Sequence, residues 1–176
     1  VQAAGKMPLD FAATGAQLMS LSSHKIHGPK GVGALIMKRG LPLMPLLHGG
    51  GHEQMLRGGT ENLASIVGFG QAAELARLEL DQRSTHVQQL RDRLQAGVLD
   101  LPGITVFAAD MPRITNTLQF SVPGYDGEAL LMDLDRAGIA VSSGSACASS
   151  KGEPSHVLLA MGLSLIHISE PTRPSQ

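Results

Sequence analysis

Residues 22–31 read Ser22-Ser23-His24-Lys25-Ile26-His27-Gly28-Pro29-Lys30-Gly31. They follow an apolar run, residues 16–21, that is typical of a short buried strand. Because glycine and proline keep the next residues from becoming a helix, the amine of Lys25 is expected at a defined point just past the end of that strand. Ser22 and His24 are two residues apart in an extended segment, so they would face one side together, where both could donate to a phosphate.

A lysine held in this way can form a Schiff base with an aldehyde cofactor. The ordinary alternative for a His-Lys pair in a polar turn is a solvated loop, and the segment alone does not decide between the two. Two later stretches, residues 48–62 and 142–152, favour the first interpretation.

Composition and charge narrow the class of protein. The 176 residues suffice for one medium domain or slightly more, with a sizeable core. The 14 basic and 15 acidic residues nearly balance and form no basic stripe, so nucleic acid is not an expected partner. With 3% aromatic residues, 21 glycines and 8 methionines, the composition suits an α/β protein with close backbone contacts.

The cellular setting is indicated by what the sequence contains. No apolar run is long enough to span a bilayer, and no secretory signal opens the chain. The single cysteine cannot form an internal disulfide, so a cytoplasmic location is the simplest expectation. The opening residues, Val1 and Gln2, resemble the middle of a protein rather than its beginning.

The hydrophobic pattern of the first hundred residues predicts strands and then helices. Strands at 17–21 and 33–38 around a tight turn suggest a hairpin or a return at a sheet edge. A buried helix at 63–80 is followed by an amphipathic helix to about residue 98, with a slight break at 81–85. These helices would connect two bodies of structure.

A second, smaller α/β body is predicted after the connector. Its expected β-β-α-β order comprises strands at 104–108 and 115–122, a helix at 129–137 and a strand at 139–142. A short helix is expected at 157–161. The predicted domain organisation is 1–62, 63–100 and 101–163, and residues 164–176 are expected to be a disordered, non-native tail.

Residues 48–62 read His48-Gly49-Gly50-Gly51-His52-Glu53-Gln54-Met55-Leu56-Arg57-Gly58-Gly59-Thr60-Glu61-Asn62. So many glycines allow backbone N–H groups to approach an anion closely. Thr60 is expected to cap the next helix, because an apolar-periodic segment follows at once. Beside Arg57, its hydroxyl is a candidate contact for a phosphate or carboxylate, although a mobile surface loop is the alternative.

Residues 142–152 surround the only cysteine, Cys147, with small polar residues. A lone cysteine is most often a buried, inert side chain. In a polar loop such as this one, exposure favours a reactive nucleophile or a sulfur carrier.

Together, the three stretches resemble cysteine desulfurases of the NifS/IscS type, which are pyridoxal-phosphate enzymes of the class-V aminotransferase superfamily. The stretches occur in the order found in that family, and the resemblance runs from Val1 to about Gly162. It implies the α/β fold type I of pyridoxal-phosphate-dependent transferases. This chain would hold the end of the large domain and most of the small C-terminal domain.

The resemblance also implies roles toward pyridoxal 5'-phosphate. Lys25 would hold the cofactor as a Schiff base, Ser22 and His24 would bind its phosphate, and Gln2 would hydrogen-bond the oxygen on its ring. Thr60 would reach the phosphate of the cofactor in the partner subunit, which makes a homodimer part of the active site.

Cys147 would be the nucleophile that takes the sulfur of L-cysteine, leaving alanine and an enzyme persulfide. The persulfide would pass to a sulfur-acceptor protein such as an iron–sulfur scaffold. The family's N-terminal half and its C-terminal substrate-binding arginine have no counterpart here, so these 176 residues alone are not expected to sustain turnover.

Three alternatives stay open at this point. A selenocysteine lyase or another class-V enzyme is the nearest, and the loop around Cys147 argues against it. A non-enzymatic phosphate-binding module is the second, but the chain lacks the Gly-Lys-Ser/Thr of a P-loop. A metal site is the third, and it would draw on His24, His27, His48, His52 and Cys147.

Overall fold

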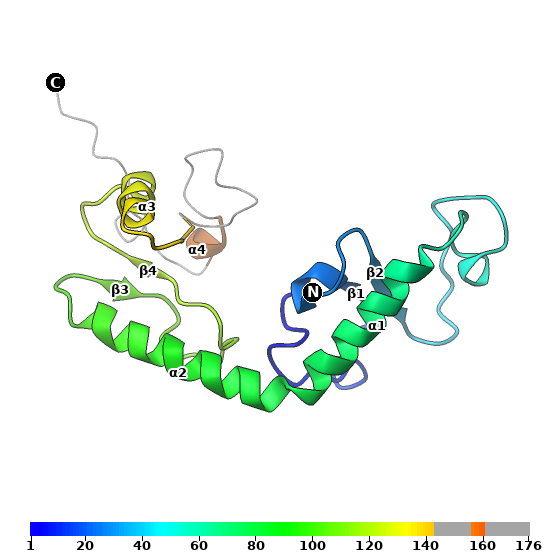
Figure 1. The fold of residues 1–176 in the computed structure, drawn as a ribbon, viewed down its shortest axis with the longest axis horizontal. Helices are drawn as coiled ribbons and strands as arrows, with labels where there is room; N and C mark the ends of the chain where they lie inside the picture. Colours follow the sequence, from blue (N-terminus) through cyan, green and yellow to red (C-terminus); the bar gives the residue numbers. More distant parts are fainter. Residues whose placement is uncertain (143–155, 161–176) are drawn as a thin grey trace, which may run out of the picture. The chain divides into compact units, whose positions relative to one another are not determined.

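The structure, a computed structural model, describes residues 1–142 and 156–160 (Figure 1). The chain divides into two units. The first comprises residues 1–90 and 114–116, and the second comprises residues 91–113 and 117–176. The domain boundaries predicted from the sequence stay predictions. None of the helices in the described part of the chain is long and apolar enough to cross a membrane.

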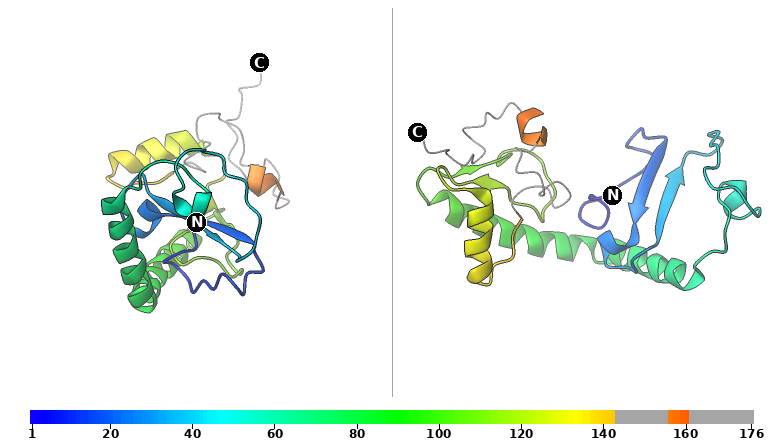
Figure 2. Two further views of the ribbon diagram at one scale, coloured as in Figure 1. Left: turned by 90° about the vertical axis from the view of Figure 1, so that its right-hand side faces the viewer. Right: turned by 90° about the horizontal axis from the view of Figure 1, so that it is seen from above.

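The first unit contains the predicted hairpin. Strands β1 (Leu18–Ser22) and β2 (Gly33–Met37) pair antiparallel, with Leu18 opposite Met37 and Ser22 opposite Gly33. They lie side by side in the right-hand view of Figure 2. The expected burial of β1 is wrong, because Leu18 is 41% exposed and, in the described part of the chain, the hairpin forms a sheet of two strands. A sheet this small leaves most of its surface open.

Helices α1 (Leu63–Leu78) and α2 (Leu80–Leu99) follow as predicted, but their junction differs. The break falls at Glu79 rather than at 81–85, where φ of −96° and ψ of 3° leave the helical region. The N-cap also differs. Asn62, not Thr60, caps α1, since its side chain accepts a hydrogen bond from the Ser65 N–H at 3.2 Å. The prediction placed the cap too early because both residue types favour that position.

Helix α1 is less buried than its apolar sequence predicted. Only Ala72 and Ala76 are buried, whereas Leu63 and Val67 are 70% and 64% exposed. A helix that is apolar on all sides has to be covered on all of them to be buried. Within the first unit, Ala72 and Ala76 form a small core with Ile26. Ala4 and Phe69 pack against this core and are partly buried.

The second unit contains a short antiparallel pair, β3 (Thr105–Val106) and β4 (Phe120–Ser121). Both strands are shorter than predicted. Ala108 takes a left-handed backbone, with φ of 52°, which ends the extended run after β3. Thr115 belongs to the first unit, where its Oγ1 lies 3.5 Å from Ser84 Oγ, so the first residues of the predicted strand 115–122 do not pair with β3.

Helices α3 (Gly127–Arg136) and α4 (His156–Ala160) lie close to their predicted positions. Asp126 caps α3 by accepting hydrogen bonds from the N–H groups of Glu128 and Ala129. The strand predicted at 139–142 is wrong, since these residues pair with no strand in the described part of the chain. β-branched residues favour an extended conformation, but a strand also requires a partner.

Candidate cofactor site

Lys25 lies in a single turn of 3-10 helix, η1 (Ser23–Ile26), that starts where β1 ends. The turn stops at His27, whose backbone is left-handed with φ of 67°. Gly28 and Pro29 then lead the chain back to β2. Lys25 is half-buried, and its amine makes no hydrogen bond or ion pair with any described residue. The local sequence therefore places the lysine just past the end of a strand, and the described residues leave its amine without a partner.

Ser22 and His24 lie together beside this lysine. The distance from Ser22 Oγ to His24 Nδ1 is 2.8 Å, and the imidazole is exposed. When the hydroxyl donates to Nδ1, the neutral ring keeps its N–H on Nε2, which is then available for a further acceptor. The two side chains thus form a small polar cluster that fits the binding of an anion next to the amine.

The turn that carries Lys25 rests on helix α1. Ile26 is 8% exposed and packs against Ala72 and Ala76. A Cβ on Gly28 would lie 3.0 Å from Ala72 Cβ, and a Cβ on Gly68 would lie 2.7 Å from the ring of Pro29. Burying an isoleucine side chain contributes about 1.5–3 kcal/mol. The lysine turn is therefore seated by close contact with small residues of the helix.

The glycine-rich loop, residues 47–62, folds back on itself. The Gly58 N–H donates to the Leu47 carbonyl at 3.0 Å. His52 Nδ1 lies 2.9 Å from Glu61 Oε1, and both side chains are partly exposed. A hydrogen bond from the Glu61 backbone and, after it, the one from His52 hold the pKa of the Glu61 carboxyl below its usual value.

The remaining residues predicted for the site lie elsewhere in the chain. The Gln2 side chain accepts a hydrogen bond from Lys6 Nζ at 3.4 Å and contacts neither Ser22 nor His24 through a hydrogen bond. Thr60 is exposed. Cys147 lies outside the described residues. The structure therefore brings together three of the predicted residues, Ser22, His24 and Lys25, within one turn.

The sequence reasoning named His52 only as a candidate metal ligand and did not single out Glu61. No periodic spacing indicates a pair that is nine residues apart across glycines, so no signal in the sequence could have found it. Within residues 1–142 and 156–160, no group of three or more His, Cys, Asp or Glu side chains could hold a metal ion.

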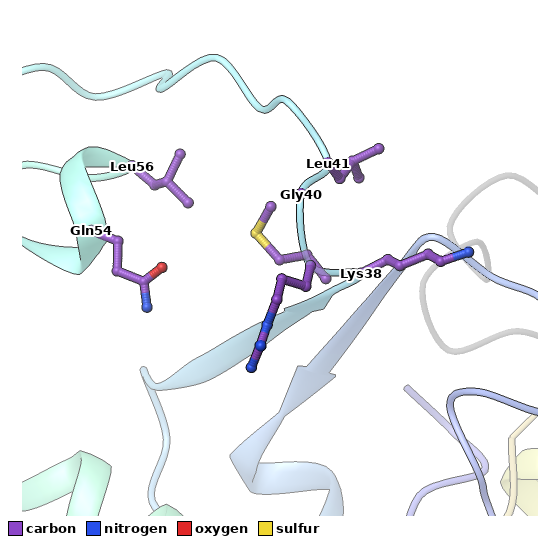
Figure 3. A pocket seen from close by; sticks show the side chains of 7 residues that line it. Lys38, Gly40, Leu41, Gln54 and Leu56 are labelled. Carbon is purple, nitrogen blue, oxygen red and sulfur yellow. The ribbon is translucent and has the colours of Figure 1, made fainter.

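A separate hollow of about 390 Å³ lies between the end of β2 and η2 (Glu53–Met55) (Figure 3). Its lining contains none of the predicted site residues and consists of Met37, Lys38, Arg39, Gly40, Leu41, Gln54 and Leu56. In Figure 3 the side chain of Lys38 extends away from Gln54 and Leu56. The hollow is thus distinct from the lysine turn.

Comparison with known families gives the class of the chain. The profile of the class-V aminotransferase family matches residues 1–170. The chain therefore belongs to the class-V aminotransferase family, as the three sequence stretches predicted. This family and the cysteine desulfurases within it are pyridoxal-phosphate enzymes in general.

Individual relatives are more specific. The chain is 48% identical over 162 residues to a cysteine desulfurase of Gluconacetobacter diazotrophicus, covering 92% of this chain and 40% of that protein. It is 46% identical over 165 residues to an IscS-like cysteine desulfurase of Mycobacterium tuberculosis, covering 93% of this chain and 42% of that protein. The chain thus spans about two fifths of the length of these relatives.

Solved structures agree with this family. A NifS-like protein superposes with a TM-score of 0.81 at 37% identity, over 96% of this chain and 43% of that one. A NifS-like protein from Rickettsia africae gives a TM-score of 0.84 at 32% identity, over 96% and 44%. The predicted fold class is confirmed. The chain has part of the α/β fold of NifS-like, pyridoxal-phosphate-dependent class-V enzymes.

Proposed function

We propose that the complete protein to which this chain belongs is a cysteine desulfurase. It would use pyridoxal 5'-phosphate to convert L-cysteine into L-alanine and a persulfide on Cys147. The observation that carries this proposal is the amine of Lys25, which no described residue pairs with, beside the Ser22–His24 pair in a chain that is 48% identical to a cysteine desulfurase.

The residues of the lysine turn fit a phosphorylated aldehyde. Ser22 Oγ and His24 Nδ1 lie 2.8 Å apart, and the pair would supply a donor for the phosphate: the Nε2 N–H of His24 when the hydroxyl donates to Nδ1, or the hydroxyl proton of Ser22 when the Nδ1 N–H donates to Oγ. Lys25 Nζ would hold the aldehyde carbon of the cofactor and would serve as the base that takes the proton from the substrate Cα. The bound cofactor supplies an electron sink for the carbon that loses this proton. Gln2 would hydrogen-bond the oxygen on the cofactor ring.

Cys147 is assigned as the sulfur acceptor on the resemblance of its surrounding sequence, since it lies outside the described residues. Its thiolate attacks the sulfur of L-cysteine, so that an S–S bond forms while the C–S bond of the substrate breaks. The electron pair of the broken bond stays with the substrate carbon, which takes up a proton and becomes the methyl group of alanine. The persulfide is then available to an acceptor protein such as an iron–sulfur scaffold.

A homodimer is part of the proposal. Thr60, at the end of the glycine-rich loop, would bind the phosphate of the cofactor held by the other subunit. The exposed position of Thr60 and the close approach of Gly49 and Gly58, where an added Cβ on Gly58 would lie 2.9 Å from Gly49 Cα, support a loop whose end is presented to a partner.

The test uses the complete protein. After incubation with pyridoxal phosphate and reduction with borohydride, peptide mass spectrometry should find the label on Lys25. Lys30, an exposed lysine of the same loop, gives the matched control, because Lys30→Ala should keep the label and Lys25→Ala should lose it. Label on another lysine would exclude the proposed site.

A second measurement separates the desulfurase from its relatives. Release of alanine from L-cysteine should require both the cofactor and Cys147, so Cys147→Ser should abolish it. Alanine formed from L-selenocysteine but not from L-cysteine would instead favour a selenocysteine lyase.

A further inference from the structure

Two cross-links close the glycine-rich loop. At its base the Gly58 N–H donates to the Leu47 carbonyl at 3.0 Å. Nearer to helix α1, His52 Nδ1 and Glu61 Oε1 lie 2.9 Å apart. Because an ionised carboxylate only accepts hydrogen bonds, the proton in this second contact is on Nδ1. Thr60 thus lies between one anchored residue, Gly58, and another, Glu61.

The backbone next to Thr60 does little to fix the orientation of this residue. Gly59 has a left-handed φ of 103°, and no described residue beyond its two neighbours lies within 4 Å of the position its Cβ would take. A glycine in such open space turns readily between conformations. The direction of Thr60 therefore depends on the residue that follows it, and Glu61 is the residue that the imidazole of His52 holds.

The segment directly after His52 is strained. Glu53, Gln54 and Met55 have φ of 50°, 56° and 66°, a left-handed conformation that side chains other than glycine rarely adopt. Such a segment persists only where its surroundings determine it. Two contacts restrain this segment. His52 contacts Glu61 before the turn, and after it the Leu56 N–H donates to the Glu53 carbonyl at 3.0 Å.

Glu61 is not needed to cap helix α1. The side chain of Asn62 makes the cap by accepting from the Ser65 N–H. The helix therefore does not need the His52–Glu61 pair as a cap, because Asn62 makes the cap. What the pair determines is the path of residues 53–60.

We propose that His52 and Glu61 are positioning residues that hold Thr60 in the direction required to bind the cofactor phosphate. This inference rests on the proposed function, in which Thr60 contacts that phosphate. In this role the pair would touch neither substrate nor cofactor. Its effect passes through the backbone between Gly58 and Glu61.

The experiment measures cofactor affinity in the complete apoprotein by absorbance, with pyridoxal phosphate and with pyridoxal, which lacks the phosphate. His52→Ala and Glu61→Gln should each weaken the binding of pyridoxal phosphate by about tenfold, the effect of one hydrogen bond to a charged group. Pyridoxal should bind all variants equally. His52→Asn should restore affinity, because its amide nitrogen can occupy the place of Nδ1 and donate to Glu61.

Two controls show whether the effect passes through Thr60. In a Thr60→Val background, the substitution His52→Ala should cause no further loss. Glu74→Gln, which removes another exposed carboxylate paired 2.8 Å from a cation, should leave the affinity for cofactor unchanged. Amide hydrogen exchange of residues 53–60 in the apoprotein should become faster in His52→Ala and Glu61→Gln.

The outcomes separate this inference from the proposed function. Additive losses from His52→Ala and Thr60→Val, or unchanged exchange of residues 53–60, would overturn the positioning role while Lys25 still carries the borohydride label. Equal loss of affinity for pyridoxal and its phosphate would also overturn it. Absence of label on Lys25 would overturn both.

Discussion

Gly28 lies directly against Ser23, so that a Cβ at position 28 would fall 2.1 Å from the Ser23 hydroxyl oxygen and 3.0 Å from Ala72 Cβ. Ser23 is fully buried, and its hydroxyl has no hydrogen-bond partner among the residues that the structure describes. The close approach of Gly28 and Ser23 lies at the two ends of the turn that carries Lys25. It links the backbone beside the candidate site to helix α1.

Gly28→Ala should therefore destabilise the apoprotein by about 1–3 kcal/mol, the usual range for overpacking. Adding Ser23→Ala removes the oxygen that the new methyl group meets, so the double variant should recover part of the loss. The free energies of unfolding from urea titrations of the two single variants and the double variant test this. If the changes in the free energy of unfolding are strictly additive, the Ser23 hydroxyl does not clash with the added methyl group.

Ser23→Ala alone should raise the free energy of unfolding by about 1 kcal/mol. An unpaired buried hydroxyl loses its hydrogen bonds to water on folding, and alanine has none to lose. Ser20→Ala, at an exposed position of β1, is the control that should change little. A loss of stability in Ser23→Ala would indicate that the hydroxyl has a partner in the complete protein.

Two glycines of α1 should respond in opposite directions to alanine. No described residue outside the helix backbone lies within 4 Å of the Cβ that Gly70 lacks, so Gly70→Ala should stabilise by about 1 kcal/mol through helix propensity. At Gly68 the new Cβ would lie 2.7 Å from the Pro29 ring, so Gly68→Ala should destabilise. Thermal unfolding followed by circular dichroism measures both, and equal gains would disprove the contact with Pro29.

The start of α1 offers a test of the cap. Asn62→Ala should lower the stability by about 1 kcal/mol, because the Ser65 N–H loses its acceptor. Thr60→Ala should leave the stability nearly unchanged, since Thr60 does not cap the helix. Denaturant midpoints of the two variants give the answer, and the reverse ranking would restore Thr60 as the cap.

The second unit carries a pH-dependent contact. Tyr125 donates a hydrogen bond to Asp133, and this bond, with the charge of the carboxylate, raises the pKa of Tyr125. Since the folded pKa lies above the unfolded one, the contribution to stability is present below the ordinary tyrosine pKa of about 10 and is lost as the pH rises through the folded pKa.

Difference absorbance of tyrosinate, taken between the wild type and Tyr125→Phe, follows this titration. In Asp133→Asn the pKa of Tyr125 should fall toward its ordinary value, whereas Asp135→Asn on the same helix should leave it raised. An unchanged titration in Asp133→Asn would show that the tyrosine is not held by that carboxylate.

Local spacing in the sequence was enough to predict the hairpin, the two long helices and the grouping of Ser22 and His24 beside Lys25. Each of these depends on residues a few positions apart, whose relative placement follows from the geometry of one strand, turn or helix. The three motif stretches likewise sufficed for the family.

Only the tertiary structure decided the rest. It paired His52 with Glu61, placed Gly28 beside Ala72 and moved the helix cap to Asn62. It also formed no strand at 139–141 within the described part of the chain. These features depend on which distant segments approach one another and on which surfaces stay uncovered. These contacts depend on how side chains pack in the folded protein, and no periodic pattern in the sequence indicates them.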